Sequence, residues 1–174
     1  MKKMTFLFVV MAMFALTTSA QKKEQMYVGG TLGLAVHTSA AKGYSNTNSM
    51  FYIAPEFGYF VADRIKVGVE LAYSVSAGSH SLLLLPNVAY YLPIVDKLYY
   101  TPQLSVGGGF DATSGHTNGA FDLILNVAAL EYQPVQNMAI SLSLIDLSYS
   151  RSNKVNGIGF NFLASPTVGF RYYF

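Results

Sequence analysis

Cysteine and tryptophan are absent from this chain of 174 residues, and only 11% of its residues are charged. The absence of cysteine excludes a disulfide scaffold and a cysteine-ligated metal site. The charged fraction is less than half of the roughly 25% that is usual in soluble globular proteins. After residue 20, no apolar stretch approaches the roughly 18 uninterrupted residues of a membrane-spanning helix. The chain is therefore rich in apolar residues, at 52%, without a sequence that would cross a membrane as a helix.

Residues 1–20 have the features of a secretory signal peptide. Lys2 and Lys3 precede an apolar run, and small residues lead to an expected cleavage site before Gln21. The eleven Lys and Arg lose two members with this leader, which leaves nine against the nine Asp and Glu. A net charge of zero argues against nucleic-acid binding, which needs a basic surface. We expect an exported chain with a single domain over residues 21–174.

Apolar and small polar residues alternate along most of the remaining chain. In one segment Val67, Val69 and Leu71 share a face, and Lys66, Gly68 and Glu70 share the other. Alternation with a period of two is the pattern of β-strands. A phase change near 144–145 indicates one extra residue, a β-bulge. Eight such segments are present, at 26–36, 51–59, 65–76, 82–92, 99–110, 121–127, 138–149 and 158–174.

The length of these segments and the composition of their two faces favour a membrane barrel. Most are longer than the 5–6 residues of an ordinary strand and match the roughly 9–11 residues of a tilted membrane-crossing strand. The face without bulky side chains is Gly, Ala, Ser, Thr and Asn, which would bury too little apolar area to form a soluble core. Because no backbone group stays unpaired in lipid, the sheet must close on itself. We therefore predict an all-β fold, a closed eight-stranded antiparallel up-and-down transmembrane β-barrel, with bulky residues toward lipid and a lumen filled by side chains.

Short and long connections alternate along the chain. Outer-membrane barrels have short periplasmic turns and longer extracellular loops, so both ends of the chain are expected in the periplasm. The expected short turns are 61–64, 93–97 and 133–137, and the expected polar loops are 38–49, 77–81, 111–119 and 150–156.

Tyrosine and phenylalanine gather next to the short turns and the chain ends. The outward-facing members are suited to a girdle at the membrane interface, and the alternative is that they are ordinary core aromatics at strand ends. The cluster comprises Tyr27, Tyr59, Phe60, Tyr90, Tyr91, Tyr99, Tyr100, Tyr132, Tyr172, Tyr173 and Phe174.

The chain resembles the small eight-stranded outer-membrane proteins of the OmpA/OmpX kind, most of all barrels of Bacteroidetes-type bacteria. The resemblance lies in residues 55–68 and 86–93, although Ala89 stands where a basic residue is expected. The terminal residues Phe170, Tyr172 and Phe174 resemble the signal read by the barrel-assembly machinery. The resemblance implies a monomer in the bacterial outer membrane, in contact with lipopolysaccharide and phospholipid.

Four charged residues on inward faces are candidates for a structural network in the lumen. Glu56 and Glu70 lie on adjacent strands at similar depth, and Arg171 is expected near them, with Lys66 close by. Charges in a dry interior must be paired, and one guanidinium is able to serve two carboxylates. The alternative is a catalytic acid/base pair, which a filled lumen makes inaccessible to substrate.

Three histidines fall near the expected extracellular end. His37, His80 and His116, with nearby serines, allow the alternative of an enzyme that modifies lipid A. Their wide separation gives no metal-ligand signature, and we predict neither a cofactor nor a metal.

The leading prediction is a non-enzymatic outer-membrane barrel that presents surface loops for adhesion or envelope integrity. A lipid A-modifying enzyme, a narrow pore and, last, a soluble ligand-binding barrel are the alternatives.

Overall fold

The computed structural model describes residues 24–41, 44–76, 78–113, 115–152 and 155–174. The predicted leader, 1–20, lies outside these residues. Within the described part of the chain, no helix is long and apolar enough to cross a membrane. The strands are β1 (Met26–Ala41), β2 (Tyr44–Ala62), β3 (Ile65–Ser76), β4 (Ser79–Tyr90), β5 (Leu92–Val95), β6 (Leu98–Tyr100), β7 (Gln103–Thr113), β8 (His116–Val135), β9 (Met138–Ser152) and β10 (Val155–Tyr173).

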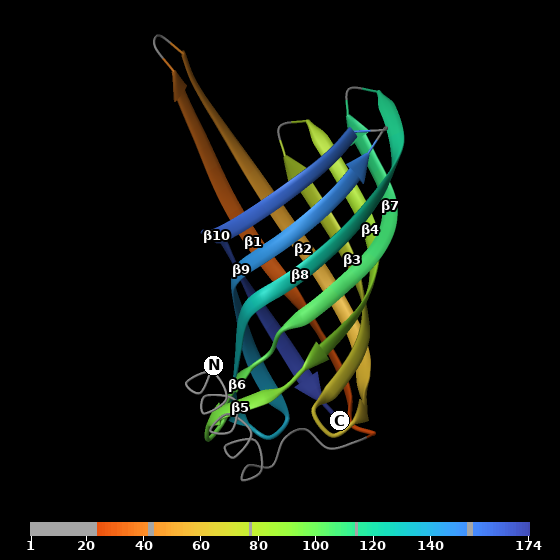
Figure 1. Ribbon diagram of the computed structural model, residues 1–174, viewed down its shortest axis with the longest axis vertical. Coiled ribbons are helices and arrows are strands. Elements are labelled where there is room, and N and C mark those ends of the chain that lie inside the picture. Colours follow the sequence, from red (N-terminus) through yellow and green to blue (C-terminus); the bar gives the residue numbers. More distant parts are fainter. Residues whose placement is uncertain (1–23, 42–43, 77, 114, 153–154) are drawn as a thin grey trace, which may run out of the picture.

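Eight strands form a closed hydrogen-bonded ring, seen from the side in Figure 1. The order around the ring is β1, β2, β3, β4, β7, β8, β9 and β10, and β10 pairs again with β1. Every pairing is antiparallel. The short strands β5 and β6 continue β4 and β7 into one further hairpin. The predicted fold class, an all-β antiparallel barrel of eight strands, is confirmed.

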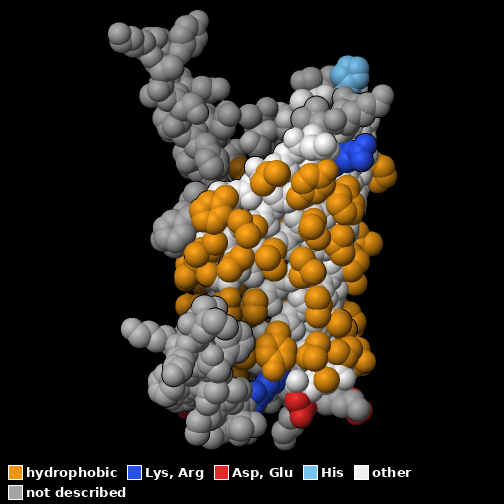
Figure 2. Space-filling view, in the orientation of Figure 1, with side chains coloured by type: hydrophobic (Ala, Val, Ile, Leu, Met, Phe, Trp, Pro, Cys, Tyr) orange, Lys and Arg blue, Asp and Glu red, His pale blue; other side chains and the backbone are white. Residues whose placement is uncertain are grey.

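The bulky apolar face points outward. Exposed and buried side chains alternate along β2, β3 and β4, as the period of two requires. Val69, Leu71, Leu104 and Phe170 are 40–53% exposed, so the predicted orientation of the two faces is confirmed. Figure 2 shows hydrophobic side chains covering the middle of the visible wall, with charged ones near its two ends.

The three short connections are tight turns at the predicted places, Asp63–Arg64, Asp96–Lys97 and Gln136–Asn137. The first and last strands meet on this same side, where Met26 and Phe174 exchange two backbone hydrogen bonds of 3.0 Å. The hairpins β1–β2, β3–β4, β7–β8 and β9–β10 join the strands at the opposite end (Figure 1).

The four segments predicted as polar loops are largely strand, and that prediction is wrong. For example, β1 and β2 pair as far as Ala41 and Tyr44, and β7 and β8 pair as far as Thr113 and His116. Pairing satisfies the backbone hydrogen bonds of these polar segments whatever their side chains are. Alternation of apolar and polar residues is visible only where one face of a strand is apolar. The sequence pattern therefore underestimates the length of strands that continue with polar residues on both faces.

The predicted bulge in β9 is confirmed. The pairings of β9 with both β8 and β10 pass over Leu144. A matching irregularity in β8 passes over Val127, between Asn126 and Ala128. This irregularity in β8 reverses which residues of the strand face the interior. Glu131 therefore points inward, where it is fully buried.

Two apolar clusters fill different levels of the interior. An aromatic cluster near the turns comprises Tyr27, Phe60, Ala89, Tyr91, Tyr99, Ala139 and Tyr173. A smaller aliphatic cluster nearer the hairpins comprises Ala54, Ala72, Leu83 and Leu85. Along β2, the acidic residue Glu56 lies between Ala54 and Phe60, so the polar residues of the lumen lie between the two clusters.

Candidate functional site: the buried ion-pair network

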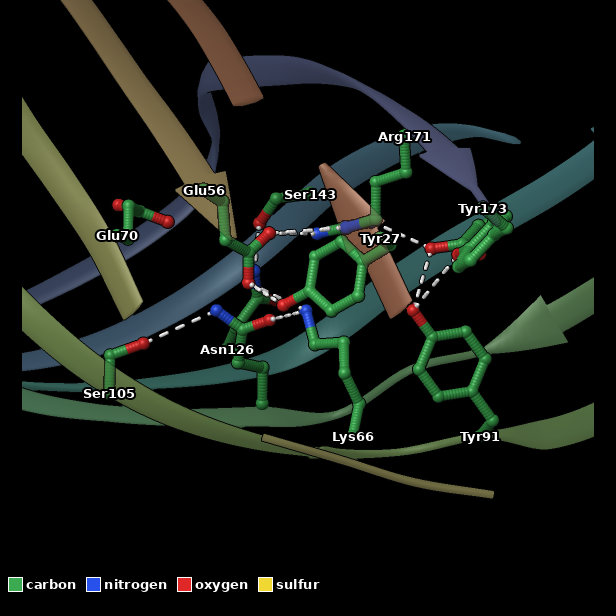
Figure 3. Close-up of polar contacts among 12 residues, drawn as sticks. Tyr27, Glu56, Lys66, Glu70, Tyr91, Ser105, Asn126, Ser143, Arg171 and Tyr173 are labelled. Carbon is green, nitrogen blue, oxygen red and sulfur yellow. Dashed lines mark hydrogen bonds and ion pairs between the residues drawn. The ribbon is translucent and has the colours of Figure 1, made fainter. Parts of the chain in front are cut away.

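Four charged side chains from four strands meet inside the barrel, and three of them, Glu56, Lys66 and Arg171, are labelled in Figure 3. Lys66 Nζ lies 2.8 Å from Glu56 Oε1, and Arg171 Nη2 lies 3.1 Å from Glu56 Oε2. Arg171 Nη1 lies 2.7 Å from Glu131 Oε2. The Glu56 and Glu131 side chains are 1% and 0% exposed. Two positive and two negative charges balance each other, and their attraction offsets part of the cost of burying them.

Arg171 reaches two carboxylates because its neighbours across the sheet are small. Gly29 of β1 stands opposite Arg171, and Ala139 of β9 stands opposite it on the other side. A Cβ atom at Gly29 would lie 2.9 Å from Arg171 Cγ. The guanidinium therefore extends across β1 toward Glu56 and across β9 toward Glu131.

Tyrosine hydroxyls complete the coordination of both carboxylates. Tyr27 donates to Glu56 Oε1 at 2.8 Å, Tyr91 donates to Glu131 Oε2 at 2.9 Å, and Tyr173 donates to Glu131 Oε1. Tyr27 has room because Gly58 and Gly68 lack side chains, and a Cβ atom at either would lie within 2.6 Å of the Tyr27 hydroxyl. These hydrogen bonds fill the acceptor sites of the carboxylates, which buried charges need in addition to an ion pair.

Lys66 is held by three contacts. Besides Glu56, its Nζ atom donates to Gln103 Oε1 at 3.0 Å and lies 5.0 Å from the centre of the Tyr27 ring. The ammonium therefore has two oxygen acceptors and an aromatic face, the surroundings in which a buried cation is stable. Its hydrogen bonds connect β3 with β2 and β7.

Glu70 has a different partner from the one predicted. It stands directly opposite Glu56 in the pairing of β2 and β3, as the sequence indicated, but it accepts a hydrogen bond from Tyr52 and makes no ion pair with Arg171. The second carboxylate on the guanidinium is Glu131. The physical reason is distance around the ring, because β8 and β2 are each two strands from β10, whereas β3 is three strands away.

Glu131 is the network residue that the sequence reasoning missed. Continuing the alternation from Asp122 and Asn126 puts Glu131 on the lipid face, and the irregularity at Val127 reverses that assignment. Two features of the sequence indicate that Glu131 faces the lumen. The apolar phase blurs at Ala128 and Ala129, and a carboxylate is rarely tolerated against hydrocarbon.

The arrangement supports a structural role. Its contacts tie together β2, β3, β8 and β10 across the lumen, and each of its carboxylates is occupied by a cation and by tyrosine hydroxyls. The groups that an acid/base reaction would use are therefore buried and already paired.

The histidines are dispersed. His80 is exposed, and its Nδ1 atom lies 3.0 Å from the Tyr73 hydroxyl on the outer wall. His116 is exposed at the start of β8. The side chain of His37 lies outside the part described. Within the described residues, no hydrogen bond joins a histidine to a serine, and no group of three or more acidic or histidine side chains is placed to hold a metal.

Ten of the eleven aromatic residues near the turns divide into two sets, and the eleventh, Tyr100, is half-buried and donates a hydrogen bond to the Val127 carbonyl. One set points into the barrel and is buried, namely Tyr27, Phe60, Tyr91, Tyr99 and Tyr173. The other set is exposed on the outer wall, namely Tyr59, Tyr90, Tyr132, Tyr172 and Phe174. The buried set consists of core aromatics at strand ends, and the exposed set lies on the outer wall, where the predicted girdle would be. The predicted assembly-signal residues Phe170, Tyr172 and Phe174 all lie on the outer wall.

Comparisons with known proteins identify the fold. No protein-family model and no curated protein matches the sequence. The structure is similar to Neisserial surface protein A, with 12% identity, a TM-score of 0.55, and coverage of 86% of this chain and 97% of that one. It is also similar to the N-terminal β-barrel domain of Pseudomonas aeruginosa OprF, with 11% identity, a TM-score of 0.55, and coverage of 88% and 100%. The chain has the fold of these small eight-stranded barrels.

Proposed function

We propose that this protein is an integral β-barrel of the bacterial outer membrane that holds four β-hairpins at the cell surface and is not an enzyme. The observation that carries the proposal is the continuous apolar outer wall. Every strand of the closed ring contributes exposed large hydrophobic side chains, and on the face seen in Figure 2 they cover the middle of the barrel. A surface of this kind is far larger than the few hundred Å² of apolar patch that a soluble monomer exposes.

The sealed turn end argues against the alternative of a narrow pore. Tyr27, Phe60, Tyr91 and Tyr173 are at most 1% exposed, and they lie next to the ion pairs of Lys66 and Arg171. An eight-stranded barrel has an interior just wide enough for side chains to fill. Purified protein in a planar bilayer is expected to give no stepwise conductance, and a reproducible single-channel current would contradict the proposal.

The proposed orientation in the membrane rests on how far the hairpins extend as polar strand at the end opposite the three tight turns. Outer-membrane barrels have short turns on the periplasmic side and longer segments outside, so the hairpin ends would lie outside the cell. An epitope inserted at Gly115, between β7 and β8, is expected to bind antibody on intact cells. The same epitope inserted between Asp96 and Lys97 is expected to bind only after the outer membrane is opened. Reversal of these results would reverse the orientation.

Lipid and the assembly machinery are the expected partners. The outer wall would contact lipopolysaccharide and phospholipid, and Phe170, Tyr172 and Phe174 would be read by the barrel-assembly machinery during insertion. We expect a monomer, because the eight-stranded ring is closed by its own strands. Light scattering in detergent micelles tests this expectation.

Lipid A analysis separates the scaffold from a lipid A-modifying enzyme. Mass spectra of lipid A from cells with and without the protein are expected to be identical. An altered acyl pattern that disappears in His80→Ala or His116→Ala variants would favour the enzyme.

A further inference from the structure

The part of β10 nearest the hairpin end is paired on one side only. β9 pairs with β10 as far as Val155, whereas β1, among the described residues, pairs with β10 only from Thr167 to its end. Beyond Gly33, β1 continues in its hairpin with β2, and Figure 1 shows the β1–β2 and β9–β10 hairpins diverging. Residues 155–166 of β10 therefore form a free edge in the wall of the barrel.

The apolar side chains beside this free edge are unusually exposed. Ile158 is 90% exposed and Phe160 is 65% exposed. Leu123 lies in the same cross-strand row as Ile158, and Leu147 lies opposite Phe160, yet these two are only 39% and 41% exposed. The difference follows from the free edge, because β8 and β9 have a neighbouring strand on both sides and β10 has one on a single side here.

Polar side chains lie at the hairpin end of the same surface. Arg151 of β9 stands opposite Phe121 of β8 and Asn156 of β10, and residues directly opposite each other in a sheet share a face. Phe121 is exposed on the outer wall, so Arg151 and Asn156, which are both exposed, face outward as well. Asn156 is two residues from Ile158 along β10, so the polar groups lie directly beyond the exposed apolar side chains.

The positive charge of Arg151 is unbalanced on this face. Asp122 and Asp146 alternate with the outward-facing Phe121 and Leu147 and therefore point into the barrel. Within the described residues, no ion pair includes Arg151, and no other Lys or Arg lies at the hairpin end. Figure 2 shows a basic side chain at the upper edge of the hydrophobic part of the visible wall. A guanidinium beyond exposed apolar side chains is complementary to an anionic amphiphile.

The chemistry of this surface favours lipopolysaccharide over a phospholipid. Both lipids carry acyl chains and phosphate, which a guanidinium binds with two parallel hydrogen bonds. The free edge of β10 also presents backbone N–H and C=O groups, which need polar partners within a membrane. The lipid A part of lipopolysaccharide carries amide and hydroxyl groups where its acyl chains begin, whereas a glycerophospholipid has ester groups there, which do not donate hydrogen bonds.

We propose that one lipopolysaccharide molecule binds along β9 and β10, with a lipid A phosphate on Arg151 and Asn156 and an acyl chain over Ile158 and Phe160. This inference rests on the proposed function, because it requires the hairpin end to lie in the outer leaflet of the outer membrane. It adds to that function a lipid site on one side of the barrel, where β1 and β10 separate.

Native mass spectrometry of the chain, refolded in uncharged detergent and titrated with diphosphoryl lipid A, tests the proposal. One retained lipid A per chain is expected. Arg151→Gln should weaken binding about tenfold, the factor for losing one charge-assisted hydrogen bond, and Ile158→Ser should weaken it about fivefold through lost apolar contact. Lys97→Gln and Val135→Ser, which change an exposed cation and an exposed apolar residue at the turn end, are the matched controls and should bind like the parent.

Four results would overturn the proposal. They are the absence of retained lipid A, parental affinity in Arg151→Gln, an equal loss in the Lys97→Gln control, and equal competition by phosphatidylglycerol, which would indicate a general surface for anionic lipids. The mobility of unheated samples in SDS gels verifies that each variant is folded before titration. The epitope assay on intact cells does not depend on lipid A binding. Failed binding with the expected epitope pattern would therefore refute this inference alone, whereas a reversed epitope pattern would refute the proposed orientation.

Discussion

Replacing Arg171 with alanine is expected to destabilise the folded barrel by about 3–5 kcal/mol, the range measured when one partner of a buried ion pair is removed. Among the described residues, the guanidinium is the only cation that contacts Glu131, and it is one of two that contact Glu56. Glu56 keeps Lys66, whereas Glu131 keeps only the hydroxyls of Tyr91 and Tyr173 and a long contact with Gln133. Most of the loss therefore comes from stranding a carboxylate that is fully buried.

Two further variants separate this effect from the loss of packing. In Arg171→Met combined with Glu131→Gln, the stranded charge is absent, so the double variant should be more stable than Arg171→Met alone. Arg151→Ala removes an exposed arginine of β9 and should change the free energy of unfolding by no more than about 0.5 kcal/mol.

The assay is urea unfolding of refolded protein in detergent micelles, followed by far-ultraviolet circular dichroism, because the chain has no tryptophan. Heated and unheated samples on SDS gels give a second measure of the folded fraction. If Arg171→Ala unfolded at the same urea concentration as Arg151→Ala, the ion pairs would contribute nothing to the barrel, and the structural role of the network would be refuted.

The remaining predictions are also tested by urea unfolding, with lipid vesicles in place of detergent micelles for the last of them. Glu131→Gln should destabilise the barrel by several times more than Glu70→Gln, because Glu131 pairs with Arg171 and Glu70 does not; equal effects would contradict the different roles of these two acids. Gly29→Ala should cost about 1–3 kcal/mol through overpacking, because its Cβ atom would lie 2.2 Å from a backbone oxygen of β10; parental stability would show that the two strands move apart freely. Leu71→Arg, on the outer wall in the middle of β3, should cost about 2–4 kcal/mol in a lipid bilayer, and a neutral result there would argue that this wall does not face hydrocarbon.

The residues of the lumen network show how far sequence reasoning reached. Glu56, Lys66 and Arg171 were identified because each is a charged residue on a face of small side chains, and the alternation places that face inside. The alternation also located the bulge at Leu144, since a second apolar phase begins immediately after it. Glu70 was placed at the correct depth opposite Glu56, but depth alone does not say which carboxylate a guanidinium reaches.

The length of the four hairpins could not be predicted from the alternation of residue types. Residues 38–49 contain mostly small polar side chains, and nothing in their order separates a paired strand from a loop. Backbone hydrogen bonding between β1 and β2, which is independent of side-chain type, decides it.

The order of residue types along the chain is enough to determine that the fold is a barrel with an apolar exterior, because strand periodicity assigns every side chain to one of two faces. Only the closed ring decides which of the inward residues meet. Arg171 joins Glu131 instead of Glu70 because strand order around the barrel sets their distance, and because one skipped residue in β8 turns Glu131 from the outer face to the inner one.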